Sequence, residues 1–587
     1  MAGWAIGDCA PNPISASPPR FIPVTPPEGG TTIQNCDFDR FFRPNPDAAS
    51  DPSVMSATTK APLSDAKRRL LQQYLSGQSS SASSATEPAI PRRTSGNVAR
   101  QSFFQEQVWI HSQIQAERPA YNEVITLHRR GPLDVPVLER CLDEIVRRHE
   151  IWRTTFEHRD GQPMQVIHGH GPGVHLPVSD LRALPPDQRL ATSRRMATED
   201  AEALFDLGRL PLWRARLIRM DEEHYQLHMT LHQIIMDGAT VFRNFMSELV
   251  PLYRAFLQGE PSPLQEPKRQ YADFAEWQRM RLGDAELAGD LAYWRRKLGG
   301  TLPVLEWPNE RPRPPVQTFR GATETLLIPA ELIEPLKALA DRESASLFMA
   351  LTAGFVALLH RYTGQEDLIL GTPAGNRSAE TEGMFGYFIN MLPLRFDLAG
   401  DPSFRELLRQ ARTVVAEALS HSGIPFVRLL RELDLPKDTS RNPLFHVMLT
   451  LEPTIPPLDP GWDLTQSEIS CGAAKLDLDL SLESRKDGVA APLLYNPDLM
   501  SAASMHRMFH HWTTLLRGAI EDPDRPISRL PVLTPAERQQ LLVTWNETQR
   551  PFPSECLPQL FEAQVQRSPD ATAVVFDGQT TTYGELN

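Results

Sequence analysis

The sequence predicts a mixed α/β fold, on the pattern of three stretches between residues 100 and 545. Residues 224–231 alternate apolar and polar side chains with the period of two that a strand requires. Residues 133–156 begin with an apolar stripe at helical spacing, made by Val137, Leu138, Cys141, Leu142 and Ile145. Residues 329–375 repeat this texture with an amphipathic helix, the apolar helix SLFMALTAGFVALLHRYTG and the strand DLILGTP. We therefore expect two similar α/β halves.

Length and composition restrict the class of protein. A chain of 587 residues is too long for one compact core. Its formal net charge of −13 argues against a nucleic-acid surface, which requires a basic field. No apolar run of membrane-spanning length and no signal peptide is present, so we expect a cytoplasmic protein without a membrane contact. The five cysteines lie far apart without CxxC spacing, so no metal site is expected.

The N-terminal flank changes in character twice. Residues 1–61 are rich in Pro, Ser, Thr, Asn and Asp without periodicity, and we expect them to be disordered. Residues 62–77 predict a helix that Ser64 caps and Gly77 ends, either a docking helix or a simple linker helix. Residues 78–99, which include a serine-rich run, are expected to form a flexible linker.

The C-terminal flank predicts the beginning of another unit. Residues 546–587 read as a linker followed by a helix, a strand and the start of a second helix. A helix begun without a partner suggests that the natural polypeptide continues or that this chain is a fragment.

One segment has a catalytic appearance, LHQIIMDGAT at residues 231–240. A histidine at the end of a strand, His232, can project into a cleft as a general base. Asp237 could hold the following turn by an ion pair, and Gly238 permits a backbone geometry that other residues resist. Spacing alone leaves a purely structural histidine as the alternative.

A family resemblance becomes specific at this segment. HQIIMDG (232–238) resembles the HHxxxDG signature of nonribosomal peptide synthetase condensation domains, which have the chloramphenicol acetyltransferase-like fold. Other stretches resemble the family's motifs in the family's order: SFFQEQVW with Ser102, Gln105 and Trp109; RHE (148–150) with Arg153-Thr-Thr-Phe156; YADFAEWQ (271–278); GTPAGNR (371–377) with Asn376 and Arg377; GYFINMLPLR (386–395) with Asn390; and SRNPLFHVM (440–448) with Ser440. The tail, LFEAQVQRSPDATAVVF followed by TTYGELN, resembles the start of an adenylation domain.

The resemblance implies an architecture and a reaction. It implies two lobes, residues 100–270 and 271–545, that form a V with a central tunnel. An acyl or peptidyl thioester on the phosphopantetheine arm of a carrier protein would meet an aminoacyl thioester on a second carrier and form an amide. The implied partners are an upstream carrier on another chain and the downstream adenylation and carrier domains of the same synthetase, and no cofactor is bound directly.

The resemblance also assigns roles to residues, with one departure from the family. The second signature histidine, which the family uses at the reacting centre, is Gln233 here, and glutamine cannot act as a general base. It can still donate to an oxyanion or orient the attacking amine. His232 would be mainly structural, and Asp237 would be a structural aspartate with Arg153 as its candidate partner. Further residues are placed near the tunnel or substrate, or serve as turn and capping residues: Ser102, Trp109, Asn376, Arg377, Asn390 and Ser440.

Two functions are compatible with this departure. Our leading hypothesis is an acyltransferase that joins a donor acyl group to a carrier-bound amino acid through an atypical HQxxxDG site. The alternative is a catalytically inactive scaffold that binds a carrier protein, the adenylation domain or a tailoring enzyme. Heterocyclisation is disfavoured because the signature begins with His232 rather than aspartate, and epimerisation because no carrier precedes this domain.

Overall fold

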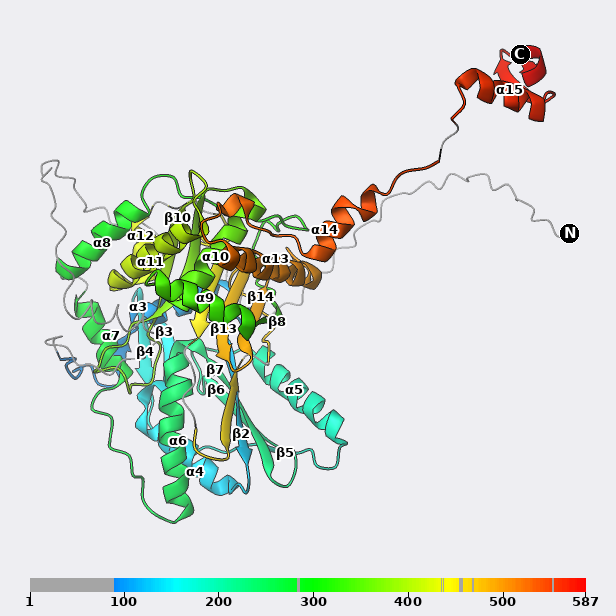
Figure 1. The fold of residues 1–587 in the computed structure, drawn as a ribbon. Coiled ribbons are helices and arrows are strands. Elements are labelled where there is room, and N and C mark those ends of the chain that lie inside the picture. Colours follow the sequence, from blue (N-terminus) through cyan, green and yellow to red (C-terminus); the bar gives the residue numbers. More distant parts are fainter. Residues whose placement is uncertain are drawn as a thin grey trace, which may run out of the picture. The chain divides into compact units, whose positions relative to one another are not determined.

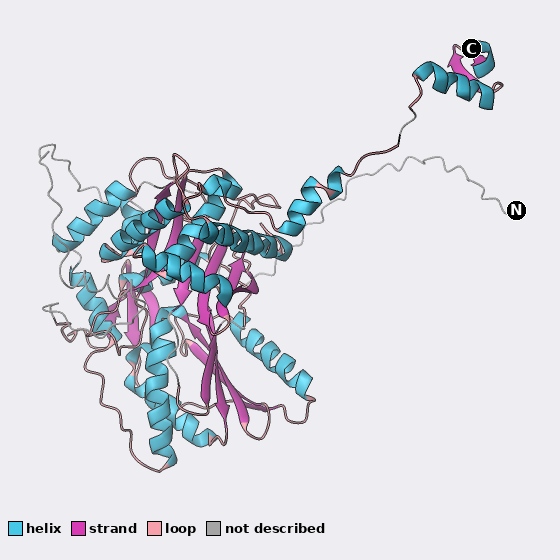
Figure 2. Ribbon diagram, in the orientation of Figure 1, coloured by secondary structure: helices cyan, strands magenta, loops and turns pink. Residues whose placement is uncertain are grey.

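The computed structural model describes residues 89–281, 285–433, 435, 438–452, 458–466, 469–551 and 554–587. The expected disordered segment 1–61, the expected helix 62–77 and residues 78–88 of the expected linker lie outside the described residues. The mixed α/β class is confirmed, with helices layered on two large sheets (Figures 1 and 2).

The first half is built on a five-stranded sheet and a three-stranded sheet. The larger has the order β12-β2-β7-β6-β5 and the smaller the order β1-β4-β3. Their strands are β1 (Val98–Arg100), β2 (Asn122–Arg130), β3 (Thr154–Arg159), β4 (Gln162–Ile167), β5 (Val178–Asp180), β6 (Trp213–Arg219), β7 (His224–His232) and β12 (Trp462–Gln466). The helices of this half are α3 (Phe103–Ile114), α4 (Val135–Arg148), η1 (Glu150–Arg153), α5 (Pro186–Glu202), η2 (Gln233–Ile235), η3 (Ala239–Phe245), α6 (Met246–Leu257) and α7 (Tyr271–Met280).

The predicted strand of the first half, β7, is buried on both faces rather than on one. Its apolar residues face the core as the alternation requires, and Met229 and Leu231 are completely buried. The opposite face is covered by α5, where Ser193 lies 2.7 Å from Nε2 of His228. Because this hydrogen bond satisfies the ring, a polar strand face can be buried beneath a helix.

The second half is built on a six-stranded sheet of order β10-β9-β11-β13-β14-β8. Its strands are β8 (Ala322–Pro329), β9 (Asp367–Gly375), β10 (Ile389–Asp397), β11 (Val447–Glu452), β13 (Leu478–Arg485) and β14 (Gly488–Tyr495). Its helices are α8 (Ala285–Lys297), α9 (Ala330–Arg342), α10 (Leu347–Thr363), α11 (Phe404–Ser420), α12 (Phe426–Glu432), α13 (Ala502–Glu521) and η5 (Ile527–Arg529). Ser346 caps α10 and Gly364 ends it in the left-handed region, as an N-cap serine and a C-terminal glycine should.

One strand from the second half joins the sheet of the first. β12 pairs antiparallel with β2, with Thr465 opposite Thr126. The chain then returns from β12 to β13 in the six-stranded sheet. The expected division at residue 270 therefore does not separate the two sheets. The segment between β12 and β13 includes Lys475, which donates to Gln233 of the signature motif.

Residues 89–99, expected to be flexible linker, are instead ordered against the first half. Ile90 is buried, and Arg93 forms ion pairs of 2.8 Å with Glu150 and 3.0 Å with Asp273. β1 adds to β4 in the small sheet. A half-buried guanidinium with two carboxylate partners holds this segment, and composition alone does not reveal such pairing.

After η5 the chain forms α14 (Pro535–Leu542) and η6 (Thr544–Asn546). The C-terminal flank then forms α15 (Leu557–Arg567), the hairpin strands β15 (Thr572–Phe576) and β16 (Gln579–Thr582), and α16 (Tyr583–Leu586). The predicted helix–strand–helix order is present, with a second short strand in addition.

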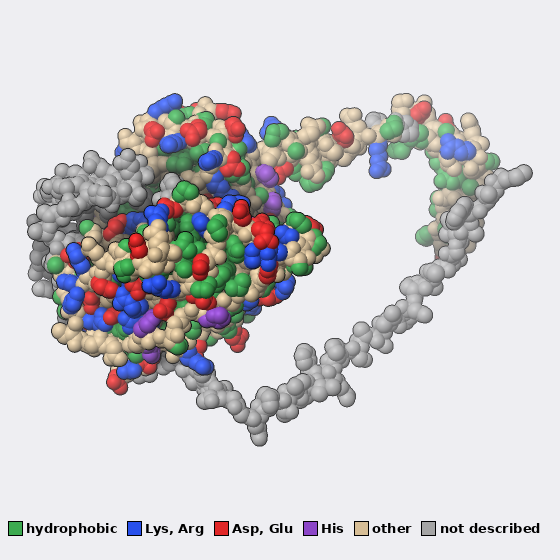
Figure 3. Space-filling model, turned by 90° about the horizontal axis from the view of Figure 1, so that it is seen from below, with side chains coloured by type: hydrophobic (Ala, Val, Ile, Leu, Met, Phe, Trp, Pro, Cys, Tyr) green, Lys and Arg blue, Asp and Glu red, His purple; other side chains and the backbone are tan. Residues whose placement is uncertain are grey.

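Two further observations concern the surface. Within the described residues no single helix is long and apolar enough to cross a membrane, and the pair α9 and α10 meets those criteria only together, with a bend of 104°. On the face drawn in Figure 3, basic and acidic side chains are interspersed with hydrophobic ones.

Candidate active site

The signature motif lies where the central strand of the first half ends. β7 finishes at His232, η2 carries Gln233, and Gly238 immediately precedes η3. The backbone N–H of Gln233 donates to the carbonyl of Tyr121, one residue before β2, so the sheet itself fixes this position.

His232 is a buried, neutral ring. Its Nδ1 accepts the backbone N–H of Ile234 at 3.2 Å, and its Nε2 lies 3.5 Å from the Ser112 hydroxyl. Burial, together with the nearby Lys475 ammonium, lowers the pKa of His232 to about 3. A nitrogen that accepts a backbone N–H cannot also take a proton from a substrate, so the ring holds the turn in place.

Gln233 is held by two charged side chains. Its Nε2 donates to Glu123 at 3.0 Å, and its Oε1 accepts from the Lys475 ammonium at 2.9 Å. Lys475 also lies 3.6 Å from Glu123 and 4.6 Å from the centre of the Tyr121 ring. The amide is thereby fixed in one orientation, with one N–H and one oxygen lone pair left for another group.

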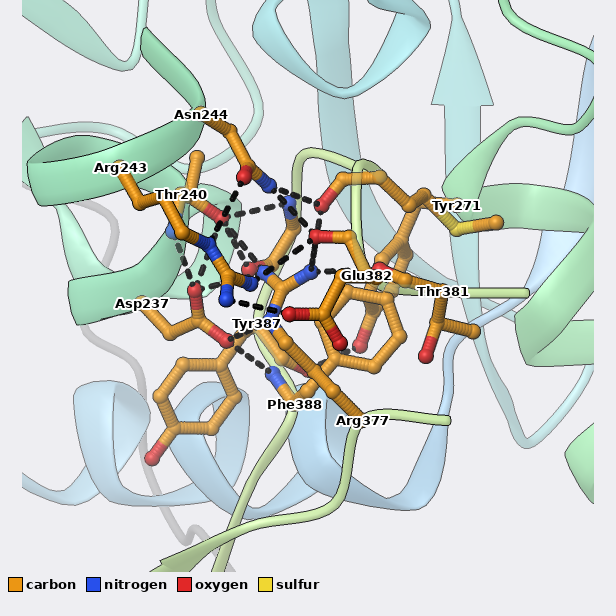
Figure 4. Close-up of polar contacts among 12 residues, drawn as sticks. Asp237, Thr240, Arg243, Asn244, Tyr271, Arg377, Thr381, Glu382, Tyr387 and Phe388 are labelled. Atoms are coloured by element: carbon orange, nitrogen blue, oxygen red, sulfur yellow. Dashed lines mark hydrogen bonds and ion pairs between the residues drawn. The ribbon is translucent and has the colours of Figure 1, made fainter. Parts of the chain in front are cut away.

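Asp237 is the centre of a buried network that joins the two halves (Figure 4). Its carboxylate receives two N–H donors from Arg377, at 2.7 and 3.1 Å. Thr240 adds its backbone N–H and its hydroxyl, each at 2.8 Å. The Arg377 guanidinium also lies 4.2 Å from the centre of the Phe388 ring. Such a bidentate pair is geometrically specific and hard to break once buried.

The prediction that Arg153 pairs with Asp237 is wrong. Arg153 follows α4 in η1 and donates instead to the carbonyl of His168. Arg377, expected near the tunnel, occupies the partner position because the turn after β9 brings it beside the start of η3.

Two glycines near the site differ in whether their position requires glycine. Gly238 has ordinary helical backbone angles, and an added Cβ would only touch Phe242 at 3.4 Å, so its predicted special geometry is absent. Gly386 has φ of +149°, and a Cβ there would lie 1.9 Å from the Tyr271 ring. Close approach of the two halves therefore requires glycine at Gly386.

The remaining residues expected near the tunnel or substrate have partners within the fold. Ser102 is completely buried, caps α3 and lies 2.8 Å from the Tyr271 hydroxyl. Asn390, also completely buried, donates to the carbonyls of Ser422 and Ile424. The others have local partners: Trp109 stacks on His158, Asn376 donates to the carbonyl of Ser422, and Ser440 donates to Asp438.

Sequence reasoning missed Glu123 and Lys475. They lie 110 and 242 residues from Gln233 along the chain. Neither belongs to a motif that the sequence singled out, so no local signal linked them to the site.

An open cavity of about 140 Å³ adjoins His232. Its lining includes Ser112, Gln115, Tyr121 and Phe205. Among the described residues, no group of three His, Cys, Asp or Glu side chains is arranged to hold a metal ion.

Comparisons with known proteins agree with this architecture. Residues 97–542 match the Condensation domain family. A linear gramicidin synthase protein of Brevibacillus parabrevis is 41% identical over 503 residues, which are 84% of this chain and 10% of that protein. The X-domain from teicoplanin biosynthesis is 28% identical with a TM-score of 0.68, covering 76% of this chain and all of that one. A second structure, the X-domain in complex with OxyB, is 27% identical with a TM-score of 0.68, covering 77% of this chain and all of that one.

The chain belongs to the condensation domain family of nonribosomal peptide synthetases. It spans about a tenth of the length of the linear gramicidin synthase proteins that it matches. Condensation domains act on substrates carried by the phosphopantetheine arms of partner carrier domains.

Proposed function

We propose that this condensation domain forms an amide between a donor acyl thioester and a carrier-bound aminoacyl acceptor, with Gln233 in place of a titratable signature residue. The observation that carries this proposal is that both ends of the Gln233 amide are engaged, by Glu123 and by Lys475. A reaction gains from groups that are held in place before the substrate arrives.

The chemistry divides between three side chains. The neutral acceptor amine attacks the thioester carbon, and the carbonyl electrons move to oxygen. The Lys475 ammonium and the remaining N–H of Gln233 donate to that oxyanion, whose stabilisation is typically the largest contribution to such catalysis. The proton of the new ammonium passes to the Glu123 carboxylate, the C–S bond breaks, and the proton then neutralises the leaving thiolate.

The proposed partners follow from the same reaction. The donor arrives on an upstream carrier of another polypeptide, and the acceptor on the carrier of the same synthetase. We further propose that the segment from α15 to α16 is the start of an adenylation domain. Its exposed apolar side chains, Phe576 at 80% and Leu557 at 82%, support packing against further protein.

The test is detection of the amide on the downstream carrier by intact mass. The chain, joined to its adenylation and carrier domains, receives a loaded donor as wild type, Gln233→Ala and Gln233→His. We expect product from the wild type and a loss of roughly 10²-fold in Gln233→Ala, by analogy with removal of one oxyanion donor. Product from Gln233→His alone, with none from the wild type, would reject the proposal.

A second candidate function is a carrier-bound scaffold for a tailoring enzyme. Two observations favour it: Gln233 cannot exchange a proton, and a similar domain is solved as a complex with OxyB. The same mass experiment separates the two functions, because a scaffold leaves both wild type and Gln233→Ala without product while loaded carrier still binds.

A further inference from the structure

One face of β11 and β13 is acidic. The two strands run parallel, with Met448 opposite Asp479, Thr450 opposite Ser481 and Glu452 opposite Glu483. Leu478, Leu480 and Leu482 are completely buried on the core side of β13. Because side chains alternate along a strand, Asp479, Ser481 and Glu483 share the other face with Glu452. Glu483 pairs with Arg485 at 2.8 Å, so we call Asp479 and Glu452 the acidic face.

The acidic face adjoins the candidate active site. Lys475 precedes Asp479 by four residues and donates to Gln233. Its charge acts on Asp479, and so does that of Glu123. Asp479 therefore lies within electrostatic reach of both groups that hold the Gln233 amide.

Asp479 has an oxygen that this structure does not satisfy. Its Oδ1 atom is shielded from solvent and has no hydrogen-bond partner among the described residues. The nearby cation, Lys475, is already engaged with Gln233 and Glu123. An unsatisfied buried carboxylate oxygen is costly, and a donor supplied by a ligand would remove that cost.

Negative charge outweighs positive charge at this place. Burial raises the pKa of Asp479 to about 7; Lys475 opposes this rise and Glu123 adds to it. Burial likewise raises the pKa of Glu452 to about 7, with contributions from Asp479, Glu123 and Glu483. Glu483 is paired with the Arg485 guanidinium at 2.8 Å, so the carboxylates that repel one another are those of Asp479, Glu452 and Glu123, with the Lys475 ammonium opposing them.

We propose that the acidic face binds a positively charged group of the substrate, an amine or a guanidinium, and so selects a cationic acyl donor or a cationic aminoacyl acceptor. The inference rests on the proposed function insofar as that function places substrate beside Gln233. A cation there would donate to Asp479 Oδ1 and neutralise Glu452, as charge-assisted hydrogen bonds do. A metal ion is a poorer match, because no three potential ligands converge among the described residues.

The first test is binding without turnover. Calorimetry at pH 8 would compare the lysyl and 2-aminoheptanoyl amides of aminopantetheine, the pantetheine analogue with an amine in place of the thiol. Their side chains have equal numbers of heavy atoms and differ in charge. A second pair, 6-aminohexanoyl and heptanoyl amides, probes the donor in the same way. We expect at least a tenfold preference for the cationic member of one pair, which identifies the substrate that carries the charge. Equal affinity within both pairs, or no measurable binding by either cationic ligand, would overturn the inference.

Variants tie the preference to the acidic face. We expect Asp479→Asn, Glu452→Gln and their combination to reduce the preference, the double variant to below about threefold. Glu331→Gln, on the exposed first turn of α9, is the matched control and should keep it. An undiminished preference in the double variant, with its thermal unfolding still cooperative, would also overturn the inference.

Failure of the inference is distinguishable from failure of the proposed function. Amide formation with neutral substrates but without cationic preference rejects the acidic-face proposal alone. Cationic preference in binding, with no amide from any donor and acceptor, rejects catalysis and leaves the binding site.

Discussion

The proposed role of Gln233 depends on the charged side chains that hold it and not on proton exchange by the glutamine itself. An amide cannot exchange a proton at neutral pH, but Glu123 and Lys475 surround it with a carboxylate and an ammonium. The functional groups that a histidine combines in one ring are here distributed over three side chains from three parts of the chain.

Lys475→Met tests this distribution. The variant removes the donor that orients the Gln233 amide and that would stabilise the oxyanion, so we expect kcat to fall roughly 10²-fold with little change in KM. Product formation is followed by intact mass under saturating donor. Lys486→Met, at an exposed position after β13, is the control and should keep the wild-type rate. An unchanged kcat in Lys475→Met would remove Lys475 from the mechanism.

Asp479→Asn should stabilise the fold in a pH-dependent manner. The pKa of Asp479 is raised from 3.8 to about 7, so the unfolded chain loses this proton at a lower pH than the folded one does. The aspartate therefore lowers the free energy of unfolding progressively as pH rises from about 4 to about 7. We expect the Tm gain of Asp479→Asn to be small at pH 4 and largest near pH 8. A gain that is equal at both pH values would contradict the raised pKa.

At the scale of elements, the turn after β9 and the start of η3 hold the two halves together. Arg377 on one side and Asp237 with Thr240 on the other form a buried, bidentate contact. Gly386 lies beside them, where the Tyr271 ring leaves no space for a side chain. The signature motif thus owes its position to an element from the other half.

Arg377→Met should destabilise the protein by about 3–5 kcal/mol, because Asp237 would be left as an unpaired buried charge. Arg153→Met replaces the residue that the sequence had indicated as the partner of Asp237. It should lower the free energy of unfolding by less than about 1 kcal/mol, since Arg153 donates to a backbone carbonyl and does not pair with Asp237. Denaturant unfolding of both variants measures the difference. Similar losses in the two variants would contradict the assignment of Arg377.

At the scale of the whole molecule, the N-terminal boundary of the folded region lies earlier than composition indicates. Ile90 is buried, Arg93 pairs with Asp273, and β1 completes the small sheet.

Two N-terminal deletions test that boundary. A protein that begins at residue 89 should keep the wild-type Tm, whereas one that begins at residue 100 should unfold several degrees lower. The longer deletion removes the buried Ile90 side chain and leaves Glu150 and Asp273 without Arg93. Differential scanning fluorimetry of both proteins is sufficient. Equal Tm values would mean that residues 89–99 contribute nothing to the fold.

Much of the fold follows from local patterns. The alternation in β7, the apolar stripe of α4 and the serine and glycine ends of α10 depend on residues a few positions apart, and all three elements are present. The signature motif was recognised for the same reason, since its seven residues are contiguous.

The side chains that contact the signature motif could not be predicted from local patterns. Arg153 was a reasonable partner for Asp237 along the sequence, yet Arg377 fills that position from 140 residues away. Glu123 meets Lys475 because β12 crosses to the sheet of the first half and the chain then returns. Periodicity and capping act over a few residues, whereas the register of strands and the approach of two sheets depend on packing throughout the chain. Motif positions can therefore be read from the residues, but the charges that surround Gln233 follow from how distant strands come together.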